Sequence, residues 1–255
     1  MSPCIVFCSC HGFVSFAFLC SNPFMQIALI GYGAMGRLVH HLAEKKEHEI
    51  VAIIHESDAG LSSAQLAEKI PDADTAIDFS VPDAVPRSVE ACLSAGVPLV
   101  EGTTGWNSRI DEIRELVEAH GGSLVYGANF SIGVNLFYRI VDNAAGLLSR
   151  FDEYETFIEE QHHSRKKDAP SGTALKLKSI VERHVATDFS VSATRAGSIP
   201  GTHRVGFDGP ADQILLEHTA RSREGFASGA LLAAEWIINK KGFYEFGDVI
   251  EEMLK

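Results

Sequence analysis

The stretch that most constrains the fold of this chain lies between Met25 and Glu56. A short apolar segment, Met25-Gln-Ile-Ala-Leu-Ile30, leads into Gly31-Tyr-Gly-Ala-Met-Gly36. Apolar residues at helical spacing follow over 38–43. A strand, a GxGxxG turn and a helix in this order are typical of a dinucleotide-binding βαβ unit. Gly31 would allow the tight turn, Gly33 the approach of the backbone to a pyrophosphate, and Gly36 close packing of the helix on the strand.

A second apolar segment over 49–54 extends the motif and ends near an acid, Glu56, twenty residues after Gly36. A carboxylate at this place can accept hydrogen bonds from the hydroxyl groups of an adenosine ribose. The full order of elements is a much more specific signal than the glycines alone. We therefore expect NADH, NADPH or both to bind here, and the expected contacts are Gly31, Gly33, Ala34, Met35, Gly36 and Glu56.

The alternation of apolar strands and amphipathic helices continues to residue 126. Strands are predicted over 75–80, 97–101 and 123–126, with helices over 84–95 and 108–120 between them. Such spacing indicates parallel strands in a doubly wound sheet, whose ligands bind at the carboxyl ends of the strands. The residues expected there, near the nicotinamide end of the cofactor, are Phe79, Ser80, Gly102, Thr103, Thr104, Asn129 and Phe130.

The pattern changes after Gly133. An apolar stripe over 136–148 predicts a helix, extended segments are predicted at 153–161 and 213–219, and a capped helix at 171–186. A long loop is expected between the helix at 171–186 and the extended segment at 213–219, because this stretch carries Gly197, Gly201, Gly206 and Gly209. The fold class is therefore α/β, a Rossmann-like doubly wound parallel sheet plus a second α+β unit for substrate binding and oligomerisation. Helices at 227–239 and 248–254 would pack back on the first unit. The expected domains are therefore a dinucleotide-binding domain, 25–131 with 229–255, and a substrate-binding and oligomerisation domain, 132–228.

Residues 1–24 differ from the rest of the chain. They contain four cysteines and no Asp, Glu, Lys or Arg, whereas Cys92 is the single cysteine that follows. A secretory signal would need a basic region before its apolar stretch. We expect Met25 to be the natural start and 1–24 to be a non-native or disordered leader, a metal or disulfide framework being the less favoured alternative. A single remaining cysteine favours a reducing, cytoplasmic location.

A basic segment at 162–167 stands out on an acidic protein. The chain has a formal charge of −12, which argues against non-specific nucleic-acid binding, and it has no apolar run long enough for a membrane span. Within the segment, His162 and His163 precede three cations, and Ser171-Gly172-Thr173 then opens an apolar helical run. Ser171 is a good N-cap, and a helix N-terminus favours an anion. This segment is predicted to bind an anion and to offer proton donors.

Several segments together resemble the 4-hydroxy-tetrahydrodipicolinate reductase (dihydrodipicolinate reductase) family over essentially all of 25–255. They are the GxGxxG turn, Gly102-Thr-Thr-Gly105, Asn129-Phe-Ser-Ile-Gly-Val-Asn135, and His162-His-x-x-Lys166-x-Asp-Ala-Pro-Ser-Gly-Thr173. The resemblance implies NAD(P)H-dependent reduction of a cyclic dicarboxylate, with loss of water, in lysine biosynthesis through diaminopimelate. It also implies acid–base roles for His162 and Lys166, substrate contacts from His163, Lys166, Ser171, Gly172, Thr173 and Thr104, and a homotetramer.

Two departures and three alternatives accompany this resemblance. The segment between Glu56 and Asp78 is short for the family. The family commonly has an Arg where this chain has Ala34, which leaves the phosphate contacts and the NADH or NADPH preference open. Another Rossmann oxidoreductase, or a dinucleotide sensor without catalysis, would also explain residues 26–56. A zinc site from His162, His163, His203 and His218 is a third alternative. We expect no metal site, because adjacent residues of an extended chain point to opposite faces.

Overall fold

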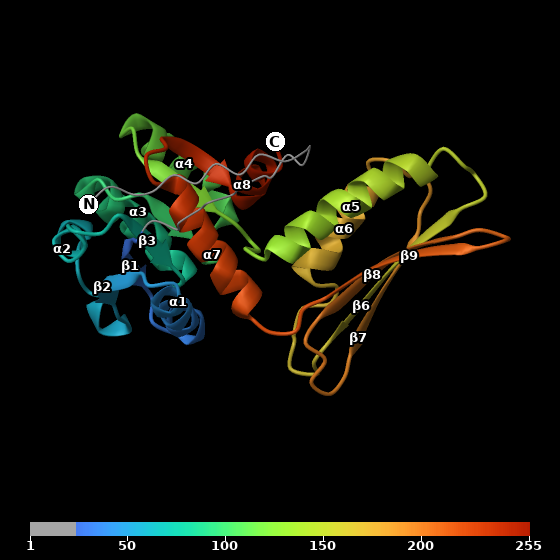
Figure 1. Cartoon of the computed structure of the whole chain (residues 1–255), viewed down its shortest axis with the longest axis horizontal. Helices are drawn as coiled ribbons and strands as arrows, with labels where there is room; N and C mark the ends of the chain where they lie inside the picture. The colour runs from blue at the N-terminus through green and yellow to red at the C-terminus, as the bar shows by residue number, and fades with distance from the viewer. Residues whose placement is uncertain (1–23) are drawn as a thin grey trace, which may run out of the picture.

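The computed structural model describes residues 24–255, and it contains two sheets, each packed with helices, that lie side by side (Figure 1). The expected leader lies outside the described residues except for Phe24, an exposed residue two positions before the first strand. Within 24–255, none of the helices combines the length and apolarity needed to cross a membrane.

The first sheet has six strands, all paired in parallel, in the order β10-β5-β4-β3-β1-β2. Their bounds are β1 Gln26–Ile30, β2 Glu49–Ile54, β3 Thr75–Asp78, β4 Leu99–Glu101, β5 Ser123–Tyr126 and β10 Gly242–Glu245. One face packs against α1 (Ala34–Lys45), α7 (Glu224–Ile237) and α8 (Phe246–Met253). The other packs against α2 (Ser63–Ala67), α3 (Val85–Ala95) and α4 (Ile110–Ala119). The prediction of a doubly wound parallel sheet is confirmed.

The second sheet has four strands in the order β7-β6-β8-β9. Their bounds are β6 Glu155–His162, β7 Ser190–Arg195, β8 Thr202–Asp208 and β9 Gln213–Thr219. Strands β6 and β7 are parallel, and the other pairs are antiparallel. Two helices, α5 (Ile132–Leu148) and α6 (Gly172–Val181), cover one face and bury an apolar core that includes Ile158, Leu177 and Val205. Helix α5 also leads from the first sheet into this unit (Figure 1).

The prediction of a long loop between 187 and 212 is wrong, because this segment contains β7 and β8. The sequence of β8 contains Gly206, which interrupts the alternation of apolar and polar residues by which a strand is recognised. A Cβ atom at Gly206 would lie 2.2 Å from the ring of Phe157 on the neighbouring strand, so the position has room for hydrogen only. The edge strand β10 was also not predicted. It is four residues long and begins at Gly242, whose φ is +129°, so it carries little periodic signal.

Candidate active site

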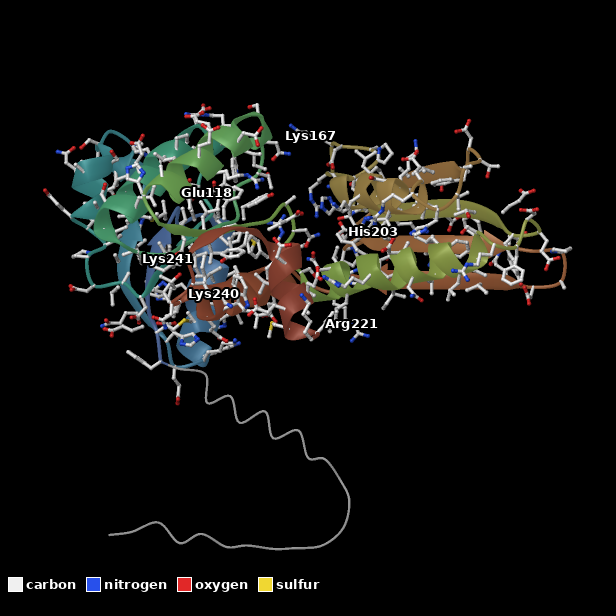
Figure 2. All side chains as sticks on the ribbon, turned by 90° about the horizontal axis from the view of Figure 1, so that it is seen from above. Glu118, Lys167, His203, Arg221, Lys240 and Lys241 are labelled. Carbon is white, nitrogen blue, oxygen red and sulfur yellow. The ribbon has the colours of Figure 1, made fainter. Side chains whose placement is uncertain are left out.

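A cavity of about 830 Å³ lies where the two units meet. Thr104 and Asn129 line it from loops of the first sheet, and Phe246 from α8. The second unit contributes His162, Lys166, Ser171, Gly172, Thr173, His203 and His218, among others. Figure 2 shows His203 near the end of the second unit that faces the first. The structure therefore brings most of the predicted substrate residues together, although His163 is not among the residues that line the cavity.

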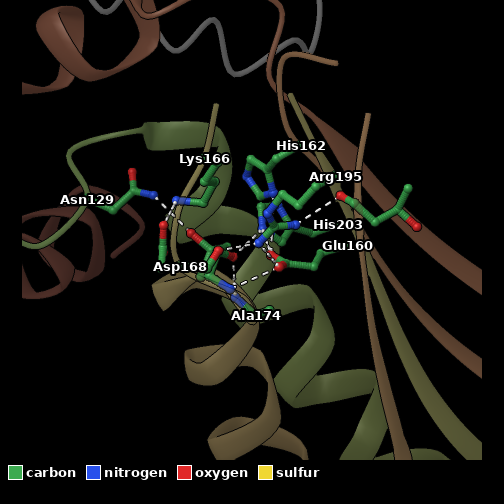
Figure 3. A network of polar contacts seen from close by, with 11 residues as sticks. Asn129, Glu160, His162, Lys166, Asp168, Ala174, Arg195 and His203 are labelled. Atoms are coloured by element: carbon green, nitrogen blue, oxygen red, sulfur yellow. Dashed lines mark hydrogen bonds and ion pairs between the residues drawn. The ribbon is translucent and has the colours of Figure 1, made fainter. Parts of the chain in front are cut away.

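Alternation along β6 places Glu160 and His162 on the same, buried face of the second sheet. Glu160 pairs with His203 of the antiparallel strand β8, and His203 pairs in turn with His218 of β9. His162 pairs with Arg195 of the parallel strand β7. Four strands thus supply one row of titratable side chains under the start of α6 (Figure 3).

Glu160 is the centre of this row, and its side chain has no exposed surface. Its Oε1 atom accepts hydrogen bonds from the backbone N–H of Ser171 at 3.0 Å and from Nη2 of Arg195 at 2.6 Å. Its Oε2 atom has no hydrogen-bond partner, but it faces Nδ1 of His162 at 3.5 Å and Nε2 of His203 at 3.6 Å. Oε1 therefore connects Glu160 to the start of α6 and to Arg195, and Oε2 is directed at two imidazoles.

Ser171 begins α6 as expected from the sequence. Its Oγ accepts a hydrogen bond from the backbone N–H of Ala174 at 3.2 Å and exchanges another with Nε2 of His203 at 3.1 Å. The first turn of α6 carries no acidic residue, so the partial positive charge of the helix terminus is not neutralised there. Nδ2 of Asn129 donates to Oγ1 of Thr173 at 3.4 Å, which connects this helix start to the first unit. The arrangement suits a carboxylate.

Burial and charge set the protonation of this row. Burial lowers the pKa of His162 and outweighs the opposite effect of Glu160, with Lys166 and Arg195 adding to the lowering. Burial also lowers the pKa of His203, to about 4, and that of His218. Burial acts to raise the pKa of Glu160, but the hydrogen bonds from Ser171 and Arg195 outweigh it, so the net pKa is lowered. In the free protein at neutral pH, an ionised Glu160 therefore faces neutral imidazoles.

Lys166 lines the same cavity as the imidazoles and lies beside His162 in Figure 3. Its Nζ atom is 2.9 Å from Oδ1 of Asp168, and its side chain is 26% exposed. The hydrogen bond with Lys166 lowers the pKa of Asp168. Lys167 is exposed and does not line the cavity. An anion entering the cavity would compete with Asp168 for Lys166.

The glycine turn after β1 has the features that a cofactor pyrophosphate requires. Gly31 has φ +82°, and a Cβ there would lie 2.6 Å from the carbonyl oxygen of Phe79. A Cβ at Gly36 would lie 2.1 Å from the carbonyl oxygen of Gly31, whereas Gly33 has open space around it. Helix α1 begins without a side-chain cap and without an acid in its first turn. The residues present therefore fit a dinucleotide, with the N–H groups of Ala34 and Met35 in the first turn of the helix.

The loops after β3 and β4 meet beside this turn. Phe79 lies against both Gly31 and Gly102. Its carbonyl oxygen would be 2.6 Å from a Cβ at Gly31, and its ring would be 2.2 Å from a Cβ at Gly102. Thr103 is buried, and its Oγ1 accepts the backbone N–H of Ser80 at 3.0 Å, so it holds the two loops together. Thr104 is exposed and lines both the large cavity and an adjoining one of about 290 Å³. Phe130 differs from these, because its ring is buried in the core against Phe246.

Two buried acids lie beneath these loops. Asp78 and Glu101 are paired across β3 and β4, and neither residue has exposed surface. Burial raises the pKa of Asp78, and burial together with the charge of Asp78 raises the pKa of Glu101 well above its usual value. Oε1 of Glu101 accepts the backbone N–H of Thr103 at 2.7 Å. These carboxyl groups anchor the loops, and their raised pKa values favour a proton within the pair.

Glu56 lies in the short 3₁₀ helix η1 (Glu56–Asp58) and is exposed. His55 is the first residue after β2, and its ring packs edge-on against Tyr32 of the glycine turn, with centroids 5.4 Å apart. The guanidinium of Arg37 lies 5.7 Å from the centroid of the same tyrosine ring. His55 and Arg37 thus lie beside the glycine turn, and neither was predicted from the sequence as a cofactor contact.

Among the described residues, Glu160, His162 and His203 are the group whose ligand atoms could hold a metal ion, all within 4.8 Å of one another. Alternate residues of one strand and a cross-strand partner make this possible, whereas the adjacent pair His162 and His163 does not share a face. The guanidinium of Arg195 lies 2.6 Å from Glu160 and already supplies a positive charge there. That charge opposes the binding of a cation.

No role was predicted from the sequence for Glu160 or Arg195, and His203 and His218 were named only as alternative zinc ligands. The i, i+2 spacing of Glu160 and His162 on a predicted strand is the one local signal for their shared face. Arg195 and His203 reach the site through strand pairings with β7 and β8, which lie in the segment predicted as a loop. Without those strands, no pattern in the sequence places them beside Glu160.

Known proteins match this chain over nearly all of the described residues. Two family models match, dihydrodipicolinate reductase N-terminus over 25–130 and C-terminus over 133–250. The 4-hydroxy-tetrahydrodipicolinate reductase of Christiangramia forsetii is 35% identical over 91% of this chain and all of its own, and that of Staphylococcus haemolyticus is 36% identical over 88% and 100%.

A solved structure, the dipicolinate-bound dihydrodipicolinate reductase of Paenisporosarcina sp. TG-14, has a TM-score of 0.74. It covers 87% of this chain and 98% of its own at 22% identity, which supports the shared fold. The ranges matched by the two family models include the glycine turn and the helix start at Ser171. The chain therefore belongs to the dihydrodipicolinate reductase family.

Proposed function

We propose that this protein reduces 4-hydroxy-tetrahydrodipicolinate to tetrahydrodipicolinate with NADH or NADPH and loss of water, in lysine biosynthesis through diaminopimelate. The observation that carries the proposal is the cavity in which Lys166, the Ser171-Gly172-Thr173 helix start and Thr104 surround His162. Two carboxylates of a cyclic substrate need separate positive sites, and the lysine and the helix terminus provide them. A proton donor between those sites meets the need of a reduction at the ring.

The cofactor supplies a hydride when it is bound, and the residues of this chain prepare the substrate for it. Lys166 exchanges its contact with Asp168 for a substrate carboxylate. The N–H groups at the start of α6 and the hydroxyl of Thr173 take the other carboxylate. The negative charge of the substrate favours protonation of His162, which then delivers a proton to the ring as the hydride arrives. Holding the ring against the nicotinamide side of the cavity, at Thr104, contributes through orientation.

The direct test is oxidation of the nicotinamide cofactor, followed by its absorbance, with substrate generated by a coupled synthase. The wild-type protein should oxidise NADH or NADPH only when the substrate is present. Binding of the cofactor alone is measured in parallel by fluorescence. A protein that binds the cofactor but does not oxidise it with this substrate would be a different Rossmann oxidoreductase or a sensor.

For the cofactor, we propose contacts at Gly31, Gly33 and Gly36, at Glu56, and at the loops carrying Ser80 and Thr104. NADH should be used at least as well as NADPH, because residues 55–62 contain no Lys or Arg and Glu56 would repel a 2′-phosphate. Specificity constants for the two cofactors test this. A strong NADPH preference would contradict the role of Glu56 and direct attention to Arg37.

For the organisation, we propose residues 25–131 with 229–255 as the dinucleotide-binding domain and 132–228 as the substrate-binding and oligomerisation domain. The face of the second sheet opposite α5 and α6 carries Phe157, Leu215 and Arg204. Leu215 is 46% exposed there, and this face supports a homotetramer. Light scattering should give a tetramer for the wild type and a smaller species for Leu215→Glu. The buried, free thiol of Cys92 supports a cytoplasmic location.

A further inference from the structure

The role of Glu160 goes beyond the residues expected to act in this family. Its carboxylate is buried, and its Oε1 already accepts two hydrogen bonds. Its Oε2 has no partner, and neither has Nδ1 of His162, although these two buried atoms lie only 3.5 Å apart. Leaving a buried acceptor unpaired is unfavourable, so a partner is expected in another state of the site. A proton on Nδ1 of His162 would satisfy both atoms at once.

We propose that Glu160 is a positioning residue that receives the Nδ1–H of protonated His162, so that Nε2 of the same ring is fixed as the donor to the substrate. The proposal rests on the function proposed above and assigns a partner to its proton donor. His203 stays neutral beside the pair and holds the hydroxyl of Ser171. Glu160 thus joins the proton donor, through its two oxygens, to the helix start that binds the carboxylate.

The residues packed around His162 hold its ring in the orientation that directs Nδ1 at Glu160. Its ring lies beside that of His203, with centroids 5.1 Å apart and nearly perpendicular planes. A Cβ at Gly201, whose φ is +130°, would lie 3.2 Å from the imidazole, so the ring is closely bounded on that side. The ring therefore has little freedom to turn Nδ1 away from Glu160. A ring bounded in this way keeps one nitrogen towards the carboxylate.

The charges around His162 oppose one another. Glu160 on β6 and Asp168 in the following loop favour the imidazolium, whereas burial, Lys166 and Arg195 on β7 oppose it. His203 on β8 and His218 on β9 complete the row and carry no charge at neutral pH, since burial lowers both pKa values. Glu160 is thus the buried negative charge that stabilises a protonated His162, and it keeps this position when Lys166 turns to the substrate. Its removal should shift the protonation of His162 and not only its position.

The variant Glu160→Gln separates charge from shape. The glutamine oxygen can still accept the N–H of Ser171, but its amide would donate to Nδ1 and so favour the neutral imidazole. If kcat falls at high pH as His162 loses its proton, the falling limb should move to lower pH by about one pH unit. At pH 7.5 kcat should drop about tenfold, and it should recover towards the wild-type value as the pH is lowered. A residue that only supports the fold would lower kcat equally at every pH.

The matched control is Glu159→Gln, the same substitution one residue earlier on β6, where the side chain lies on the opposite face and is 44% exposed. It should leave the pH profile unchanged. If Glu160→Gln does not fold, Glu160→Asp keeps the charge but withdraws it by one methylene, and the same limb should move in the same direction by less. A uniform fall in kcat without movement of the limb, in either variant that folds, overturns the proposal.

A measurement on the wild-type protein needs neither variant nor turnover. With ¹⁵N-labelled histidine and saturating pyridine-2,6-dicarboxylate at neutral pH, Nδ1 of His162 should show the shift of a protonated nitrogen. A bare Nδ1 in this complex overturns the proposal whatever the variants do. The proposed function fails separately, if the wild-type enzyme does not oxidise the cofactor with the substrate while the histidine measurement still gives its result.

Discussion

Buried carboxyl groups lie in the strands of both units of the molecule, and their surroundings shift their pKa values in opposite directions. In the first unit, Asp78 and Glu101 face each other, and burial with mutual repulsion raises the pKa of Glu101. In the second unit, Glu160 meets Arg195 and the start of α6, and their hydrogen bonds lower its pKa in spite of burial. The same side-chain chemistry is therefore shifted towards the neutral form in one unit and towards the ionised form in the other.

The difference follows from what each unit has to bind. The first unit presents backbone N–H groups to an anionic cofactor, and a buried negative charge beneath its loops would oppose that binding. The second unit contains several cations and imidazoles around one cavity, so the buried carboxylate of Glu160 offsets part of that charge and, in our proposal, orients the proton donor. Substitutions in the second unit should therefore affect catalysis, whereas those at the acid pair of the first unit should mainly affect stability.

The largest expected effect is that of His162→Gln. Glutamine keeps a polar side chain of similar bulk but cannot donate a titrating proton, so kcat should fall by about 10²–10⁴-fold. Steady-state kinetics measure the loss, and NADH titration by fluorescence should give wild-type binding. A variant that loses NADH binding to the same extent as activity would contradict the separation of the two units.

Lys166→Ala should have the next largest effect. A charge-assisted contact to a substrate carboxylate is lost, so kcat should fall and KM should rise, together lowering kcat/KM by about 10²-fold. Lys167→Ala is the matched control, because Lys167 is exposed and does not line the cavity, and it should be nearly silent. Equal, small effects of the two substitutions would mean that the basic segment is only a solvated loop.

The same contrast between the units explains how much the sequence could predict. The first unit is built mainly from consecutive βαβ crossovers, so the glycine turn and strands β1 to β5 are coded locally and were predicted, whereas the edge strand β10 was not. Ser171 was recognised as a cap for the same reason. The row containing Glu160, Arg195 and His203 depends on cross-strand register in a sheet whose strands β7 and β8 were not predicted. Partners more than thirty residues apart are brought together by pairing, which local periodicity does not reveal.

Glu160→Gln should destabilise the protein at neutral pH by about 2–3 kcal/mol, since it leaves the mostly buried Arg195 without a counter-charge. The sign follows from the lowered pKa of Glu160. A carboxyl group with a lower pKa in the folded state stabilises it above the unfolded pKa, and this contribution is lost as the pH falls through the folded pKa. The difference from wild type in urea unfolding should therefore shrink in acid. A difference that is constant with pH would indicate lost packing instead.

Glu101→Gln, the same substitution in the first unit, should have the smallest effect and the opposite sign. The pKa of Glu101 is raised in the folded state, so folding holds a proton that the unfolded chain releases above its own pKa of about 4.3. The wild-type protein therefore loses stability as the pH rises above that value, and glutamine removes this loss while its oxygen still accepts the N–H of Thr103. Urea unfolding should show no gain near pH 4 and a gain on the order of 1 kcal/mol at pH 7, because Asp78 remains buried and retains part of the cost. A loss of stability at pH 7 comparable to that of Glu160→Gln would mean that Glu101 is ionised in the folded protein, and the contrast between the two units would disappear.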